Sequence, residues 1–335
     1  MSNPNVTVLI TTYNYGRFIE EAIDSVLAQD YPLEKIQIIV VDDGSTDDTC
    51  QRVRKYSSRL EYYQKPNGGQ ASALNFGLAR ARGEIVAPLD ADDLFVPSKL
   101  RCITRAFQAH PGVGMVYHRT RLWKSDTNEY WEYELFNAVS GNIYESPRGV
   151  TSYITQPTTC VCFRRQSVSA LLPIPENIRM NADCFLVALI PFLSPVLALP
   201  EVLSIYRVHG QNAYYAEEQQ MPREMLLRRL TIWQTVCREM TRWVRANGSP
   251  RKSVRAFVDG WNACLERQCF VLATPGRFRY FRFVLLENRL SRPHQSWKLN
   301  LFNYMFSPVA LILGYKRASR FYEYRRKALK TISGQ

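Results

Sequence analysis

Two carboxylates spaced for metal binding follow a strand-like segment of this chain. Asp90 and Asp92 come directly after the segment 84–89, which is apolar except for Glu84. Carboxylates two positions apart in a loop can hold one Mg²⁺ or Mn²⁺ and leave its other positions open to water and phosphate oxygens. The sequence therefore predicts a divalent-cation site at Asp90 and Asp92, and a solvated acidic turn is the alternative interpretation.

The first 120 residues alternate between strand and helix patterns, which predicts an α/β domain with a mainly parallel sheet. We expect strands at 6–10, 36–41, 60–63 and 84–89, and helices at 18–27 and 71–81. Ser45 or Thr46 is expected to cap a further helix that opens with Asp47. Since ligands of such sheets bind at the carboxyl ends of the strands, the polar segments 11–14, 42–45 and 90–93 should meet at one edge.

Composition and missing motifs exclude several classes of protein. No Gly-x-Gly-x-x-Gly follows the first strand and no Gly-x-x-x-x-Gly-Lys-Ser/Thr occurs, which disfavours a Rossmann dehydrogenase and a P-loop NTPase. The eight cysteines form no Cys-x-x-Cys pair, so we expect reduced thiols in a cytosolic protein. We expect neither a signal peptide nor a membrane-spanning helix.

Charge is distributed unevenly along the chain, whose net charge is +13. Residues 216–335 hold 23 basic and 8 acidic side chains, and residues 1–215 have a net charge of −2. An apolar stripe from Leu226 to Leu265 predicts a helical hairpin. Residues 276–335 have a net charge of +11 and many interleaved aromatic residues. This C-terminal region is expected to meet an anionic partner, namely a membrane surface, a nucleic acid or a polyanionic substrate.

Four motifs together resemble those of family-2 glycosyltransferases with the GT-A fold. They are VLITTYNYGRFI at 8–19, VVDDGSTDDT at 40–49, NGGQASALNFG at 67–77 and LDADD at 89–93. The resemblance implies a Rossmann-like mixed, mainly parallel sheet with helices on both faces. It predicts a catalytic domain at 1–215, with a nucleotide-sugar-binding half at 1–120 and an acceptor half at 121–215. A basic, mainly helical region is expected at 216–335.

The resemblance also assigns roles on the donor side, residue by residue. Thr11, Tyr13 and Asp43 match the positions that bind the nucleobase. Lys65 and Gln70 lie in the stretch that borders the nucleotide. Asp90 matches the acid nearest the ribose and the metal, and Asp92 matches the acid that holds the metal bridging the diphosphate. Asp93 is adjacent and is a further candidate for that task.

On the acceptor side, the resemblance places a catalytic base at Asp183. An acid that favours the dipole at a helix N-terminus is the alternative interpretation of this residue. Glu176 and Glu201 are the reserve candidates for the base. His209 is a candidate metal ligand or diphosphate contact, beside Arg207 as a candidate phosphate partner.

One further segment of the acceptor half has two interpretations. Thr158, Thr159 and Cys160 either line the acceptor pocket or belong to a strand of the mixed sheet.

The function that we expect is inverting transfer of a sugar from a nucleotide-diphosphate sugar, preferably a UDP-sugar, to a hydroxyl. A bound Mn²⁺ or Mg²⁺ would stabilise the departing diphosphate. The expected acceptor is a glycan or a lipid-linked glycan in the synthesis of cell-surface polysaccharide or glycolipid. The basic region would dock on the anionic cytosolic face of a membrane, and we expect no nucleic acid partner. The alternatives are a non-catalytic nucleotide-sugar or polyanion-binding protein and a polyprenyl-phosphate sugar synthase.

Overall fold

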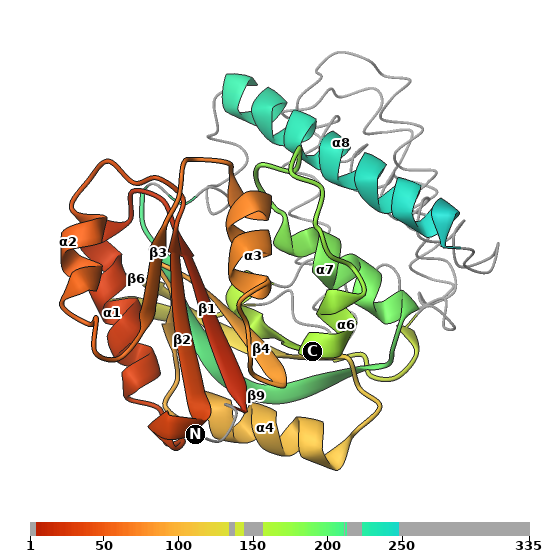
Figure 1. The fold of residues 1–335 in the computed structure, drawn as a ribbon, viewed down its shortest axis with the longest axis horizontal. Coiled ribbons are helices and arrows are strands. Elements are labelled where there is room, and N and C mark those ends of the chain that lie inside the picture. The colour runs from red at the N-terminus through yellow and green to blue at the C-terminus, as the bar shows by residue number, and fades with distance from the viewer. Residues whose placement is uncertain (1–4, 134–137, 144–156, 211, 213–222, 248–335) are drawn as a thin grey trace, which may run out of the picture. The chain divides into compact units, whose positions relative to one another are not determined.

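The computed structural model describes residues 5–133, 138–143, 157–210, 212 and 223–247. Strands and helices alternate in the first part of the chain, as the sequence predicts (Figure 1). These elements are β1 (Val6–Thr12), α1 (Gly16–Leu27), η1 (Leu33–Lys35), β2 (Ile36–Asp42), α2 (Thr49–Arg54), β3 (Glu61–Gln64), α3 (Gln70–Leu78) and β4 (Ile85–Asp90).

Short strands, turns and helices make up the rest of the described chain. They are β5 (Leu94–Phe95), α4 (Lys99–Ala109), β6 (Met115–Lys124), β7 (Glu129–Glu132), η3 (Thr158–Cys160), β8 (Val161–Arg164), α6 (Arg165–Ser169), α7 (Asp183–Leu189), η4 (Ile190–Phe192), β9 (Val196–Val208) and α8 (Arg223–Ala246).

The described strands form one mixed sheet in the order β3-β2-β1-β4-β8-β6-β9-β5, with β7 paired to β6. β1 pairs in parallel with β2 and β4, and β2 pairs in parallel with β3. β8 runs antiparallel to both β4 and β6. The four parallel strands carry the motifs of the first half, so their carboxyl ends bring those motifs to one edge of the sheet.

Helices cover both faces of the parallel strands, because successive residues of a strand point to opposite sides. Val8 and Ile10 of β1 belong to one buried cluster with Ile19 and Ile23 of α1. On the other face, Leu9 packs against α3 at Gly77. A Cβ atom at Gly77 would lie 2.3 Å from Leu9 Cδ1, so the absence of a side chain there lets the helix approach the sheet.

The helix expected after the acidic turn is present, but its predicted start at Asp47 and its predicted cap at Ser45 or Thr46 are wrong, because Asp48 is the N-cap. α2 begins at Thr49. The Asp47 carboxylate instead accepts the backbone N–H of Thr49 at 3.1 Å and that of Gly16, the first residue of α1, at 3.0 Å. The acidic turn therefore stabilises the start of two helices rather than forming a helical turn itself.

The chain divides into two compact units by its internal contacts. Met1–Ala216 with Thr235–Pro250 form one unit, and Glu217–Gln234 with Arg251–Gln335 form the other. α8 confirms the first helix of the predicted hairpin, and its Val236 and Met240 are buried. The second predicted helix and the tail at 276–335 lie outside the described residues. Within the described part of the chain, no helix has the length and apolarity needed to cross a membrane.

Candidate active site

The loop after β4 presents its three acids to different surroundings. Asp90 ends β4 and is half-buried, as is Asp92, whereas Asp93 is fully buried. The Asp93 carboxylate accepts the Thr159 hydroxyl at 2.6 Å and the Arg207 backbone N–H at 3.0 Å. These contacts tie the loop to η3 and β9. The position of Asp93 therefore supports a structural role rather than the metal-binding role considered for it.

Mutual repulsion among carboxylates makes the other two acids a candidate cation site. Removal from water raises the pKa of Asp90 well above its ordinary value, and the negative charges of Asp92 and Asp183 raise it further. A divalent cation beside Asp90 and Asp92 would replace this repulsion by attraction, and carboxylate oxygens are suitable ligands for Mg²⁺ and Mn²⁺. The residues present therefore fit the predicted cation.

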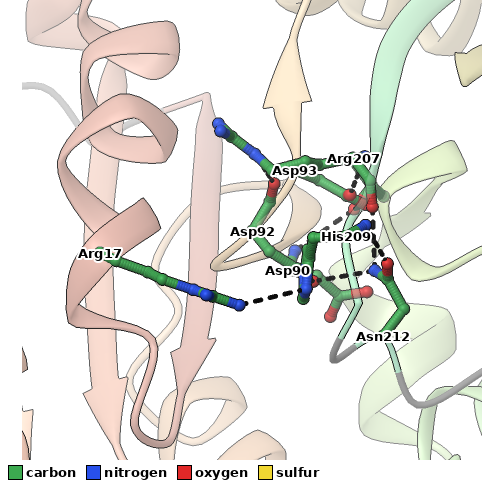
Figure 2. Close-up of polar contacts among 8 residues, drawn as sticks. Arg17, Asp90, Asp92, Asp93, Arg207, His209 and Asn212 are labelled. Carbon is green, nitrogen blue, oxygen red and sulfur yellow. Dashed lines mark hydrogen bonds and ion pairs between the residues drawn. The ribbon is translucent and has the colours of Figure 1, made fainter. Parts of the chain in front are cut away.

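His209 donates a hydrogen bond to the Asp92 carboxylate. Its Nε2 lies 3.0 Å from Asp92 Oδ2, and its Nδ1 lies 3.4 Å from the Arg17 guanidinium (Figure 2). A guanidinium can only donate, so Nδ1 accepts and Nε2 carries the proton. Among the described residues, no group of three or more His, Cys, Asp or Glu side chains is arranged to hold a metal ion. Because Nε2 carries the proton in this arrangement, it could bind a metal ion only after losing that proton. The role of His209 as a metal ligand therefore stays a prediction.

Arg207 lies beneath the loop rather than open to a phosphate group. Its Nε donates to the Asp92 carbonyl oxygen at 2.8 Å, and its Nη2 lies 2.8 Å from a Glu21 carboxylate oxygen. Its guanidinium carbon lies 4.8 Å from the ring centre of Phe18 and 4.5 Å from that of Trp123. Because Arg207 is almost fully buried, its visible task is to position the loop that carries Asp92.

At the end of β2, Asp43 is held by groups of its own chain. Its carboxylate accepts the Lys65 ammonium at 2.7 Å and the backbone N–H groups of Gly68 and Gly69 at 3.0 and 2.7 Å. Asp43 is 3% exposed, and the neighbouring Tyr13 ring is 47% exposed. The predicted base-binding residues Tyr13 and Asp43 thus lie at the same edge, with Lys65 neutralising Asp43.

Gln70 connects the donor half to the segment that precedes the predicted base. Its side-chain Oε1 accepts the backbone N–H of Ala182 at 2.9 Å, and its own N–H donates to the Arg179 carbonyl at 2.9 Å. In addition, the Arg179 guanidinium donates to Asn67 Oδ1 at 2.6 Å. In this structure Gln70 supports the approach to Asp183, a contact that its position in the sequence motif does not reveal.

Asp183 begins α7 and lies close to the acids of the loop. It is buried, and its Oδ2 accepts the Thr158 hydroxyl at 3.0 Å. The hydroxyl of the adjacent Thr159 donates to Asp93, so η3 connects Asp183 with the loop that carries Asp90 and Asp92. Burial raises the pKa of Asp183, which makes it a stronger proton acceptor than an ordinary aspartate. By contrast, the reserve candidates Glu176 and Glu201 are both exposed.

Sequence reasoning missed two groups that this site uses, Arg17 and Glu21, and left a third open. Arg17 contacts His209 from α1, and it lies inside the first quoted motif, which was the available signal. Glu21 follows one helical turn later and pairs with Arg207. Thr158 and Thr159 lie in the short helical turn η3, so their interpretation as part of a strand is wrong.

Most of the described residues match the model of a known protein family, and the chain is similar in sequence to proteins of other organisms. Residues 7–172 match the model of glycosyl transferase family 2. An uncharacterized glycosyltransferase of Nostoc sp. (strain PCC 7120) is 34% identical over 220 residues, which are 62% of this chain and 66% of that protein. One from Rickettsia bellii is 30% identical over 222 residues, covering 64% of this chain and 30% of the relative. The alignment therefore spans about two thirds of the length of the Nostoc protein and less than one third of the length of the Rickettsia bellii protein.

Solved structures show the same fold. TarS residues 1–349 from S. aureus superpose with a TM-score of 0.61 at 18% identity, covering 99% of this chain and 92% of that one. The mannosyltransferase PcManGT from Pyrobaculum calidifontis, in complex with GDP-Man and Mn²⁺, gives a TM-score of 0.56 at 20% identity, with coverages of 99% and 88%. The predicted GT-A fold is thereby confirmed.

Proposed function

Because the chain belongs to glycosyl transferase family 2, we propose that it transfers a sugar from a nucleotide-diphosphate sugar to an acceptor hydroxyl with inversion. One observation carries the proposal: adjacent residues of η3 contact both sets of acids, since the Thr158 hydroxyl donates to Asp183 and the Thr159 hydroxyl donates to Asp93 of the loop that carries Asp90 and Asp92. A proton acceptor, Asp183, thus lies near the acids that would hold the cation, and this cation would stabilise the diphosphate. This is the arrangement that direct displacement needs.

In the proposed reaction, Asp183 removes the proton of the acceptor hydroxyl while that oxygen attacks the anomeric carbon. The bond from this carbon to the diphosphate breaks on the opposite face, and the nucleoside diphosphate leaves with the bonding electrons. Asp92 and Asp90 would hold Mn²⁺ or Mg²⁺, which supplies charge stabilisation to the departing diphosphate. Arg207 and Asp93 hold the loop in place during this step.

The donor is best supported as a UDP-sugar. TarS has been solved with UDP-GlcNAc, and PcManGT with GDP-Man and Mn²⁺. A screen of UDP- and GDP-sugars by thermal shift with Mn²⁺ tests the donor class, and the anomeric configuration of the product tests inversion. If no nucleotide sugar stabilises the protein, the non-catalytic polyanion-binding alternative gains support. A polyprenyl-phosphate sugar as the product would instead support the alternative of a polyprenyl-phosphate sugar synthase.

Thr158→Val is predicted to slow transfer by roughly 10- to 100-fold, because hydrogen bonds to charged groups are worth about 1.5–3 kcal/mol. The variant keeps the shape of the side chain and removes the hydroxyl that orients Asp183. Hydrolysis of the donor by water measures the effect without a known acceptor. Thr158→Ser, which restores the hydroxyl, is the matched control. Equal rates for wild type and Thr158→Val would contradict this role.

The basic C-terminal region is proposed to dock the enzyme on an anionic membrane surface, at the cytosolic face. Residues 276–335 combine 13 basic side chains with many aromatic rings, which suits the headgroup zone. The segment from Ser307 to Leu313 is the proposed interfacial helix, and packing on the catalytic domain is its alternative. Such a location fits a lipid-linked acceptor and a role in cell-surface polysaccharide or glycolipid synthesis.

The protein is predicted to co-sediment with vesicles that contain phosphatidylserine and to remain in the supernatant with neutral vesicles. Raising the ionic strength should release it, because salt screens the attraction of basic side chains to anionic lipid. Deletion of residues 276–335 should abolish co-sedimentation. Equal binding to both kinds of vesicle, or to neither, would exclude electrostatic docking.

A further inference from the structure

A row of planar side chains runs across three neighbouring strands beside the proposed active site. Tyr130 of β7 pairs directly with Trp123 of β6, and Trp123 pairs directly with Arg207 of β9. The Tyr130 and Trp123 rings are stacked, with centres 5.8 Å apart and an angle of 8° between their planes. On the Arg207 side, the guanidinium carbon lies 4.5 Å from the Trp123 ring centre. We call these three residues the aromatic row.

The inner end of the aromatic row touches the loop that carries the proposed metal ligands. Arg207 Nε donates to the Asp92 carbonyl at 2.8 Å. Trp123 is the middle residue of the row, and its ring is fixed by a hydrogen bond from the indole N–H to Asn128 Oδ1 at 3.0 Å. The row is therefore a fixed structure that extends from the reaction centre to the edge strand β7.

The outer end of the row lies on the side of β6 that also carries the base-orienting turn. β8 pairs with Met115–Tyr117 of β6, β7 pairs with Arg121–Lys124, and η3 immediately precedes β8 and contacts β6. Along β6, η3 thus falls between β8 and β7. At about 3.3 Å per residue, Trp123 lies roughly 10 Å along β6 from Thr120. Tyr130, which lies opposite Trp123, is therefore about the same distance along β6 from the part of the strand beside η3.

Tyr130 is the member of the row whose ring is open. It is 49% exposed and lies in an edge strand, whereas Trp123 has a planar neighbour on each side. A charged pair lies on the same face: Glu132, two positions along β7, is paired with Arg119. A sugar ring has C–H groups on one face and hydroxyls at its rim, so an aromatic surface with a charged pair beside it matches both features.

This inference rests on the proposed function. We propose that the exposed face of Tyr130 is an acceptor subsite, which binds a sugar ring of the acceptor glycan next to the unit that receives the new sugar. The aromatic row sets the distance of this subsite from Asp92 and Asp183. Binding there would orient a long glycan toward the reaction centre, and it would contribute nothing to binding of the nucleotide sugar.

The test compares Tyr130→Ala with Tyr130→Phe on an array of immobilised oligosaccharides. Tyr130→Ala is predicted to lose roughly 5- to 10-fold in retention on the glycans that hold the wild type, the scale of one aromatic contact. Tyr130→Phe keeps the ring and should bind as the wild type does. Leu33→Ala is the matched control, because Leu33 is 39% exposed and lies at the amino end of β2, whereas the proposed site lies at the carboxyl ends of the parallel strands. Leu33→Ala should retain the same glycans as the wild type, to the same extent.

A second measurement separates failure of this inference from failure of the proposed function. Thermal shift with UDP- and GDP-sugars and Mn²⁺ should be the same for wild type and Tyr130→Ala. With a retained glycan as acceptor, Tyr130→Ala should raise its KM and change kcat less. The acceptor subsite is overturned if Tyr130→Ala retains glycans as the wild type does, or if the wild type retains none. Absence of any nucleotide-sugar shift in the wild type would instead overturn the proposed function.

Discussion

Asp92→Asn is expected to abolish sugar transfer, with a loss of about 10³-fold or more. The substitution removes the charge that would hold the divalent cation, and stabilisation of the departing diphosphate by such a cation is worth several kcal/mol. The fold should survive, because the asparagine oxygen can still accept the hydrogen bond from His209 Nε2. Initial rates at increasing Mn²⁺ concentration, beside thermal shift of the donor with and without Mn²⁺, measure the effect.

Asp30→Asn is the matched control for Asp92→Asn. Asp30 forms an exposed ion pair with Arg101 at 2.8 Å, and such pairs contribute little to stability. The control should keep the activity and the Mn²⁺ dependence of the wild type. Near-normal turnover of Asp92→Asn, or full wild-type activity in EDTA, would show that Asp92 does not hold a cation needed for the reaction.

The second large effect is expected for Asp183→Asn, which should reduce transfer by roughly 10²-fold or more, in the range of general bases. Asparagine keeps the shape of the side chain and cannot take a proton from the acceptor. Affinity for the nucleotide sugar should change little, because the described contacts of Asp183 lie in η3 and α7. Calorimetric titration of the donor, beside the transfer assay, separates binding from catalysis.

Stability gives an independent check on the same variant. Burial raises the pKa of Asp183 in the folded state above its value in the unfolded chain. Its ionisation at neutral pH therefore costs stability, and this cost disappears as the pH falls through the folded-state pKa. Asp183→Asn should raise the melting temperature at pH 7 while it lowers activity. Loss of donor binding would move Asp183 to the donor site, and inactivity of Glu201→Gln alone would make Glu201 the base.

The local pattern of apolar and polar residues was sufficient to predict how the strands and motifs of the donor half are arranged. The mainly apolar segments 36–41 and 84–89 correspond to β2 and β4, and the polar motifs lie at one edge because parallel strands end on the same side of a sheet. Asp90 and Asp92 could be chosen from the sequence because their spacing along one loop is itself the chemical signal. The family and the GT-A fold followed from four motifs in a fixed order.

Only the tertiary structure decided what each polar group contacts. Asp93 is adjacent to Asp92 in the sequence, yet β9 and η3 bury it, because the register of distant strands sets that environment. Arg17 and His209 are 192 positions apart in the sequence yet in contact, and the adjacent Thr158 and Thr159 donate to Asp183 and Asp93. Periodicity reports the face of an element that is buried, and it carries no information on which distant element packs against that face.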